Sequence, residues 1–208
     1  MSAGIGVTDR PRDDRDWKVA DTICAGCHAA EHDGFASSKH GMRAAEGLGP
    51  MSPGHARAKM KPDAAGKSLG CTSCHGAHSF DRQQAAVAAC ESCHDDDHTR
   101  AYRQSPHFVA WQKEQAQQAP PGTGVSCASC HLPRFTARVG DSTAVRVQHN
   151  QNGNLRPSDR MARDVCQSCH GMPFSLTALA DPSSIKRNFV GPPAPVVTGM
   201  TLVQKEAR

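Results

Sequence analysis

The residues of this sequence best suited to chemistry are its cysteines and histidines, which occur in one repeated pattern. All ten cysteines fall into five Cys-x-x-Cys pairs, and a histidine follows each pair directly. In such a motif the two thiols form thioethers with the vinyl groups of a haem, and the imidazole binds the iron as its proximal ligand. The sequence therefore predicts five covalently bound haem c groups. The motif residues are Cys24, Cys27 and His28; Cys71, Cys74 and His75; Cys90, Cys93 and His94; Cys127, Cys130 and His131; and Cys166, Cys169 and His170.

Three other uses of paired cysteines are weaker interpretations of this pattern. Zinc sites also use Cys-x-x-Cys pairs, but they do not require a histidine directly after each second cysteine. Histidine makes up 12 of 208 residues, so five such coincidences by composition alone have odds of about one in a million. Disulfide scaffolds occur mostly in secreted chains shorter than this one. A redox-active Cys-x-x-Cys pair explains neither the fivefold repetition nor the histidines.

The seven histidines outside the motifs are candidates for the sixth ligand of each iron. A spare histidine in an ordinary domain is usually a surface or packing residue. Five irons that each need a second axial ligand reverse that expectation, because neutral imidazole is a good haem ligand. The seven candidates are His32, His40, His55, His78, His98, His107 and His149.

An internal repeat ranks these candidates. Residues 24–41 (CAGCHAAEHDGFASSKHG) parallel residues 90–108 (CESCHDDDHTRAYRQSPHF). Each copy has a histidine eight residues after its first cysteine, then an aromatic residue, then Ser-x-His. A duplicated haem-binding unit is the simplest explanation. His40 and His107 lie 12 and 13 residues beyond their own proximal histidines, a span of roughly 18 Å if helical, so we expect each to bind a neighbouring haem.

Two further histidines are predicted distal ligands. His78 lies three residues after His75 and cannot reach the opposite face of the same haem, so we expect it to serve a neighbour. His149 lies in a polar loop between the fourth and fifth motifs.

The fifth distal ligand is left open among three histidines. His98 and His55 rank equally, and His32 comes after them. His32 and His98 follow a proximal histidine by four residues, and hydrogen bonding to a propionate or solvent exposure explains them equally well. His55 lies in a Gly- and Pro-rich loop that could fold over a haem. Methionine thioethers are further candidates, although each is more often a packing residue: Met42, Met51, Met60, Met172 and Met200.

The composition also requires a cofactor. Leu, Ile, Val and Phe together number 29 of 208 residues, below the share of roughly 20% expected of a globular core. The formal charge is only +4 and the sequence is varied, which argues against disorder. Flat apolar macrocycles would supply the missing interior. The ten propionates of five haems would outnumber the excess positive charge, and no basic run accompanies it, so nucleic acid is not an expected partner.

These observations predict a mainly α fold with extensive irregular loops and little or no β-sheet. We expect a flexible charged lead-in over residues 1–20, a pentahaem domain over 21–170 and a Pro-rich extension over 171–208. Residues 100–118 have helical composition, and 139–147 could form one short strand. No stretch is long and apolar enough for a transmembrane segment, and the N-terminus lacks the apolar region of a secretory signal.

Several motifs resemble the multihaem cytochrome superfamily of hydroxylamine oxidoreductase, pentahaem nitrite reductase and cytochrome c554. They are Ser-Lys-His-Gly at 38–41, Cys-His-Gly-x-His at 74–78, Ser-Pro-His-Phe at 105–108, and Gly-Val-Ser-Cys-Ala-Ser-Cys-His-Leu-Pro at 124–133. The resemblance covers residues 21–171. It implies a mostly helical fold around stacked haems with bis-histidine ligation.

The catalytic features of that superfamily are missing. There is no Cys-x-x-Cys-Lys motif and no histidine after His170, whereas the nitrite reductases carry a ligating histidine on a C-terminal helix. Hydroxylamine oxidoreductase uses a cross-linked tyrosine. The single tyrosine here, Tyr102, corresponds to Phe35 in the other copy of the repeat, which favours packing over catalysis.

The preferred function is therefore electron transfer between redox proteins, with no catalytic residues. An oxidoreductase acting on a small nitrogen or sulfur compound at a five-coordinate haem is the alternative, since the His-free C-terminal segment could leave one iron, such as that of the fourth motif, without a sixth ligand. A third hypothesis is a homo-oligomer in which an adjacent subunit supplies that ligand. Because haem c is normally attached after export, we expect a periplasmic or extracellular location.

Overall fold

Short helices joined by irregular segments make up most of the protein, described by a computed structural model over residues 16–79, 81, 83–154 and 159–194. About 49% of the chain is helical, which confirms the predicted mainly α class. No helix of these residues is both long and apolar enough to cross a bilayer. The α-helices are α1 (Asp16–Ala25), α2 (Ala29–Ala36), α3 (Met42–Ala45), α4 (Ala89–Glu91), α5 (Asp97–Tyr102), α6 (Pro106–Gln115), α7 (Cys127–His131), α8 (Asp159–Asp164), α9 (Met172–Ala180) and α10 (Pro182–Lys186). Single turns of 3-10 helix are η1 (Pro53–His55), η2 (Pro62–Ala64), η3 (Cys71–Ser73), η5 (Gln151–Asn154) and η6 (Cys166–Ser168), and η4 (Gln84–Ala88) is a π-helix.

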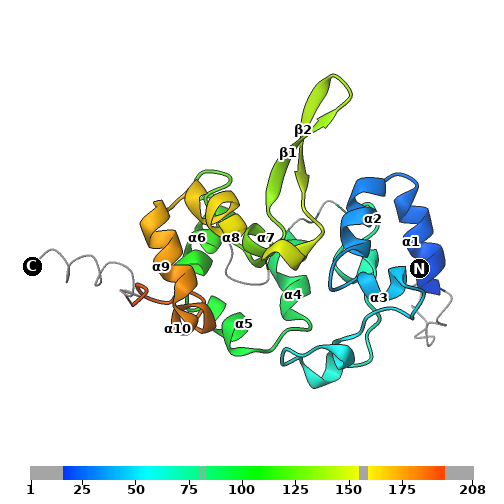
Figure 1. Ribbon diagram of the computed structural model, residues 1–208, viewed down its shortest axis with the longest axis horizontal. Coiled ribbons are helices and arrows are strands. Elements are labelled where there is room, and N and C mark those ends of the chain that lie inside the picture. Colours follow the sequence, from blue (N-terminus) through cyan, green and yellow to red (C-terminus); the bar gives the residue numbers. More distant parts are fainter. Residues whose placement is uncertain (1–15, 80, 82, 155–158, 195–208) are drawn as a thin grey trace, which may run out of the picture.

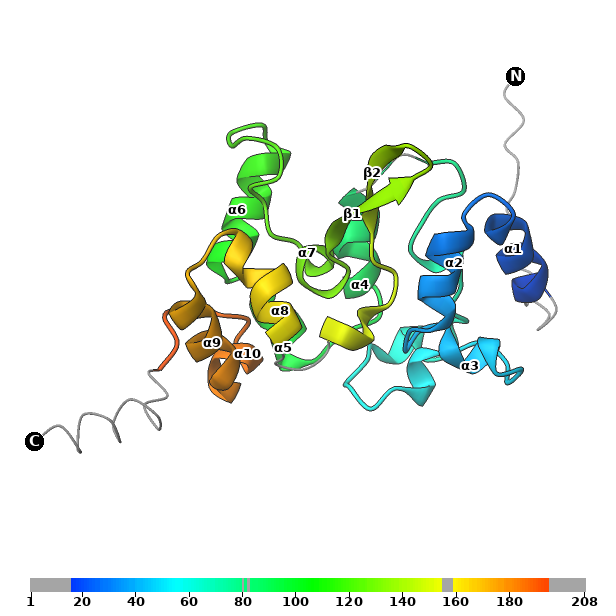
Figure 2. The same ribbon diagram turned by 45° about the horizontal axis from the view of Figure 1, so that its top comes forward.

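The molecule is elongated, and the chain runs along it with one return: α5 and α6 lie towards the end formed by α9 and α10, and α7 lies back beside α4 (Figure 1). Helices α1–α3 form one end, α9 and α10 the other, and α4 and α7 lie between them. Figure 2 shows the same order after a turn of 45°. The cysteine motifs lie between α1 and α2, in η3, around α4, in α7 and in η6. They are therefore spread along the long axis of the molecule in the order of the sequence.

A β-hairpin projects from the middle of the molecule (Figure 1). Strands β1 (Arg134–Val139) and β2 (Ser142–Val147) pair antiparallel, with Arg134 opposite Val147. The prediction of one strand over 139–147 was wrong, because Gly140, with a φ of 60°, and the residue after it form a two-residue turn inside that span. An ion pair of 3.3 Å between Arg146 and Glu31 connects the hairpin to α2.

The two copies of the internal repeat share a buried serine that positions the Ser-x-His histidine. Ser38 and Ser105 are both fully buried. Each side chain accepts a hydrogen bond from the backbone N–H three residues later, at 3.2 and 3.1 Å. Each backbone N–H donates to the carbonyl of the preceding aromatic residue, Phe35 or Tyr102, at 2.9 Å. The repeated sequence pattern thus corresponds to a repeated turn.

Serine and proline residues also set the ends of helices. The predicted helix over 100–118 is two helices, because Ser105 caps α6 and Pro106 occupies its first turn. In the C-terminal extension, prolines begin both α9 and α10, as expected of a segment that cannot form one long helix. At the other end of the chain, α1 already begins at Asp16, inside the expected lead-in. The rest of that lead-in, residues 1–15, and the end of the extension, including Met200, lie outside the described residues.

The polypeptide forms very little apolar core of its own. The largest fully buried side chains among the described residues are four serines. One small cluster, of Met161, Ala162 and Leu179, joins α8 to α9. Large apolar side chains such as Ile23 and Leu176 are instead 71% and 51% exposed. Interiors of folded proteins are normally close-packed with apolar side chains, so this chain fits a fold assembled around large apolar cofactors.

We predict that Tyr102 stabilises the fold without taking part in chemistry. Its side chain is 3% exposed, burial raises its pKa, and its hydroxyl donates a 2.8 Å hydrogen bond to the Val125 carbonyl. Tyr102→Phe removes this bond and should lower the free energy of unfolding by about 1 kcal/mol, measured by denaturant unfolding. The visible absorption spectrum should stay unchanged; an altered spectrum at unchanged stability would contradict the packing role.

Candidate haem sites

Four pairs of histidine rings are the main feature of the site. Each pair joins one motif histidine to one histidine from outside the motifs. Two imidazoles that bind one metal from opposite sides, through metal–nitrogen bonds of about 2 Å, have ring centres roughly 6 Å apart. The pairs suit that geometry. Their centroid separations are 6.3 Å for His40 and His94, 6.2 Å for His75 and His149, 6.1 Å for His98 and His131, and 6.1 Å for His107 and His170.

The pairing follows the internal repeat. His40, from the first copy, meets the histidine of the third motif, and His107, from the second copy, meets that of the fifth. Each Ser-x-His histidine therefore reaches the motif two places further along the chain. His149 pairs backward with the second motif. Of the three histidines between which the sequence did not decide, His98 is the one in a pair.

Backbone carbonyls orient two of the paired histidines. His131 Nδ1 lies 3.1 Å from the carbonyl of Asn154, and His149 Nδ1 lies 3.0 Å from that of Val147. An Nδ1–H that donates to a carbonyl fixes the tautomer and leaves Nε2 free as a ligand, which is the usual arrangement of metal-binding histidines. Asn154 also donates from Nδ2 to the Cys130 carbonyl at 3.0 Å, so it connects a motif cysteine to its histidine.

The C-terminal extension supports His98. The Ile185 carbonyl lies 2.5 Å from His98 Nδ1, and the Phe189 ring packs against His98 edge-on at 6.5 Å. Asn188 Nδ2 lies 3.1 Å from both the carbonyl and Nε2 of His98. Metal binding at Nε2 requires the amide to give up the second contact. These supporting residues were not foreseen, because nothing in the sequence links the extension to a histidine 87 residues earlier.

A carboxylate lies beside the third motif. Asp96 Oδ2 is 3.9 Å from His94 Nδ1, and the interaction with His94 is the largest of the effects that hold the Asp96 pKa below its usual range. Asp96 also caps α5 by accepting a 2.9 Å bond from the Thr99 N–H. The same residue therefore starts a helix and adds negative charge beside a candidate ligand.

Four of the paired histidines have pKa values below the usual range. Burial, together with the nearby His94 and His131, lowers the pKa of His40 to about 4. Burial also lowers the pKa values of His75, His107 and His131. Imidazoles with lowered pKa values are neutral at neutral pH and have a lone pair available for a metal.

The cysteines of successive motifs lie close together. None of the ten is in a disulfide, and Cys27 and Cys169, from the first and last motifs, are the exposed ones. Each motif therefore has a cysteine close to a cysteine of the next motif in the sequence. The neighbours are Cys24 and Cys71, Cys74 and Cys90, Cys90 and Cys127, and Cys130 and Cys166.

The thiols differ from those of thiol-redox sites. Burial, followed by nearby cysteines, raises the pKa of Cys74 to about 11 and that of Cys130 to about 12. Thiol nucleophiles are instead thiolates with lowered pKa values. Within the described part of the chain, no group of three or more His, Cys, Asp or Glu side chains is arranged to hold a metal ion. Pairs of ligands fit haem iron, whose four other ligands come from the porphyrin.

The first motif differs from the other four. No ring contact joins His28 to a second histidine among the described residues, although it is close enough to His75 to lower the pKa of that residue. Three candidate distal ligands, His32, His55 and His78, also have no ring contact with another histidine among the described residues. His55 Nδ1 lies 2.9 Å from the Ser52 hydroxyl, and His32 Nδ1 lies 3.7 Å from Asp33 Oδ1. His78 has a positive φ of 53°.

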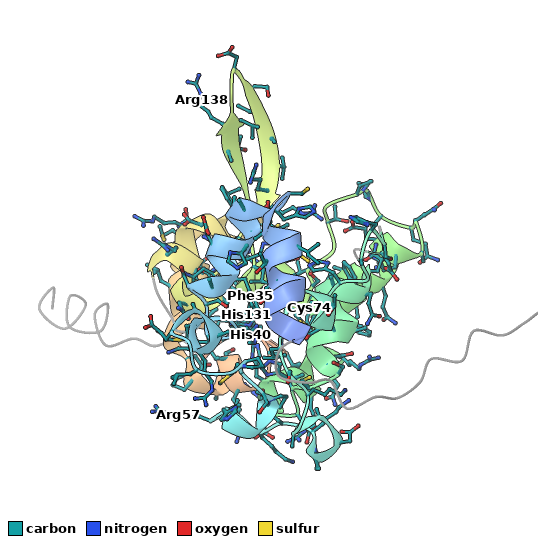
Figure 3. All side chains as sticks on the ribbon, turned by 90° about the vertical axis from the view of Figure 1, so that its right-hand side faces the viewer. Phe35, His40, Arg57, Cys74, His131 and Arg138 are labelled. Carbon is teal, nitrogen blue, oxygen red and sulfur yellow. The ribbon has the colours of Figure 1, made fainter. Side chains whose placement is uncertain are left out.

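Seen end-on, the candidate ligands lie near the long axis of the molecule (Figure 3). His40, Cys74 and His131 lie near the centre of this view, whereas Arg138 lies near the tip of the hairpin and Arg57 at the periphery. These three labelled side chains, which come from three separate segments of the chain, therefore lie close to the long axis in this view.

Comparison with known proteins supports this class of site. Residues 23–88, which include the first and second motifs, match the family described as cytochrome c554 and c-prime. The match supports a c-type cytochrome of the multihaem kind, with covalently bound haem c and a role in electron transfer. No curated protein and no solved structure matches the chain.

We predict that the turn over residues 38–41, which carries His40, tolerates no side chain at Gly41. A Cβ there would collide with the carbonyl and ring of Phe35. Gly41→Ala should lower the free energy of unfolding by about 1–3 kcal/mol, measured by denaturant unfolding. Gly49→Ala is the matched control, because a Cβ at Gly49 meets nothing within 4 Å. Equal stability of the two variants would contradict this description of the turn.

Proposed function

We propose that this chain is a pentahaem cytochrome c that relays electrons between redox proteins through mostly bis-histidine haems. The observation that carries the proposal is the set of four histidine pairs, each with ring centroids 6.1–6.3 Å apart and each containing one motif histidine. Chance contacts between surface histidines would not select one motif member each time. The match to the cytochrome c554 and c-prime family supports the same class of function.

The cysteines and the paired histidines would have different roles in binding the haems. The cysteine pairs would hold each cofactor covalently, and the paired imidazoles would bind its iron. Haem iron supplies reversible one-electron chemistry when bound. An iron with two imidazole ligands has no position for a substrate, which favours electron transfer over catalysis. Because the two exposed cysteines belong to the first and fifth motifs, redox partners would approach at these two motifs.

One iron remains, which His28 of the first motif would bind. We assign His78 as its distal ligand. His32 follows His28 by one helical turn, with a 2.9 Å hydrogen bond from its N–H to the His28 carbonyl, so it would lie on the same side of that haem as His28. His55 Nδ1 interacts with both the backbone N–H and the hydroxyl of Ser52. His78 has the left-handed φ of 53°, a conformation that costs a residue other than glycine energy and is often kept for function.

The unpaired state of His28 also supports a second candidate function. If no residue binds opposite His28, that iron is five-coordinate and could exchange electrons with a small nitrogen or sulfur compound. The sequence favoured the fourth motif for such a site, but His131 has His98 as its neighbour at 6.1 Å. The first motif is therefore the better candidate for an open site.

The expected location and partners of the protein follow from haem chemistry. Haem c is attached outside the cytoplasm in most organisms that make it, so a periplasmic or extracellular location is part of the proposal. A donor and an acceptor redox protein are the expected partners. Assembly into a homo-oligomer, with a ligand supplied by an adjacent subunit, is the alternative if neither His78 nor His32 binds the first iron.

The spin state of ferric variants tests the proposal. Replacing any one of the four paired outer histidines by alanine should convert one haem from low-spin to high-spin, seen by electron paramagnetic resonance, because the iron loses one strong-field ligand. Free imidazole should restore the low-spin signal. The proposal fails if none of these variants gains a high-spin haem. The variants are His40→Ala, His98→Ala, His107→Ala and His149→Ala, and His55→Ala is the control expected to change nothing.

A second pair of variants decides the ligand at the first motif. His78→Ala should create one high-spin haem, whereas His32→Ala should leave all five low-spin, because His32 lies on the same side of the haem as His28. The reverse result would exclude His78. A high-spin haem already present in the unaltered protein, together with activity towards nitrite or hydroxylamine, would favour the oxidoreductase alternative.

A further inference from the structure

Three buried polar atoms among the described residues have no hydrogen-bond partner. They are Arg43 Nε, Gln151 Oε1 and Ser184 Oγ. Buried polar groups in native proteins are nearly always paired with protein, water or a ligand. Such atoms mark places where water or a bound cofactor can supply the missing partner.

Each of these atoms belongs to a residue close to a histidine pair. Arg43 follows His40 by three residues, and Gln151 follows His149 by two. Ser184 precedes Ile185, whose carbonyl contacts His98. The unpartnered atoms thus adjoin three of the four candidate iron sites, which agrees with contact to a cofactor bound there.

Arg43 differs from the other two because its side chain is charged. A water molecule can satisfy a buried hydroxyl or amide, whereas a buried guanidinium N–H is best satisfied by an anionic acceptor. Among the ion pairs of the described residues, no carboxylate contacts Arg43. The candidate iron site next to Arg43 in the sequence is the His40–His94 pair, and the anionic groups of a haem are its propionates.

We propose that Arg43 forms an ion pair with a propionate of the haem bound between His40 and His94 and thereby raises the reduction potential of that haem. The inference rests on the proposed function. A propionate without a counter-ion favours the ferric iron, which carries one more positive charge than the ferrous iron. A guanidinium at the propionate offsets that preference. Asp96, 3.9 Å from His94 Nδ1, is a negative group on the other side of the same pair and acts in the opposite direction.

Arg43 would therefore be a positioning and tuning residue, not a ligand. Its position in α3, directly after the turn that carries His40, means that one short segment supplies both the distal ligand and the cation. Arginine suits this role because its planar guanidinium can bind a carboxylate through two parallel hydrogen bonds.

Spectroelectrochemical titration of the five-haem protein tests the proposal. Arg43→Gln should shift one of the five midpoint potentials downward and leave the other four in place. The haem concerned should be the one that becomes high-spin in His40→Ala. Arg138→Gln is the matched control, because it removes the same charge near the tip of the hairpin, away from the histidine pairs (Figure 3). Unmoved potentials in Arg43→Gln, or a uniform shift equal to that of Arg138→Gln, would overturn the assignment.

A substitute variant and the haem content of the unaltered protein complete the test of Arg43. If Arg43→Gln loses haem, the uncharged Arg43→Met replaces it and should shift the same potential downward, whereas Arg43→Lys retains the charge and should leave that potential close to its unaltered value. An unmoved potential in Arg43→Met overturns the proposal as well. The haem content of the unaltered protein separates the two levels of inference, because a protein without haem refutes the proposed function itself, whereas five haems with unmoved potentials refute only the role of Arg43.

Discussion

A metal that binds two imidazoles from opposite sides holds their rings roughly 6 Å apart, and the architecture of this protein is organised around four repetitions of that separation. The paired histidines come from segments far apart in the sequence: His40 lies after α2 and His94 after α4, while His107 lies in α6 and His170 beside α9. Between these segments there is almost no apolar packing. In such a chain, coordination and haem burial would together replace the hydrophobic core as the link between distant elements.

This constraint explains why the remaining structure is so irregular. Helices need only be long enough to present a motif or a ligand, and most are between one and three turns. Their ends are fixed locally by serine, aspartate and proline, as at Ser105 and Asp96. The polar atoms that remain buried without partners belong to residues that follow or precede residues of the histidine pairs, as Arg43 follows His40. Under the proposed function, local capping and the haem sites would together account for the fold.

Some of this could be predicted from the sequence, and the limits have physical causes. The motif spacing and the repeat predicted that His40 and His107 bind neighbouring haems. The structure places their rings beside His94 and His170 of other motifs, and the binding of haem iron there stays a prediction. The choice between His98, His55 and His32 could not be made, because it depends on contacts of His98 with α10, which are long-range. A strand was predicted over 139–147, which contains β2 but not the paired strand β1. The turn lies inside the predicted segment, and Gly140, a residue typical of such turns, could have indicated it.

The mass of the purified polypeptide, produced with haem attachment in place, tests the central claim most directly. The account predicts the mass of the chain plus five covalently attached haems, stable to denaturation because the thioether bonds survive unfolding. A mass without added macrocycles, or with only zinc bound and lost on unfolding, would contradict it.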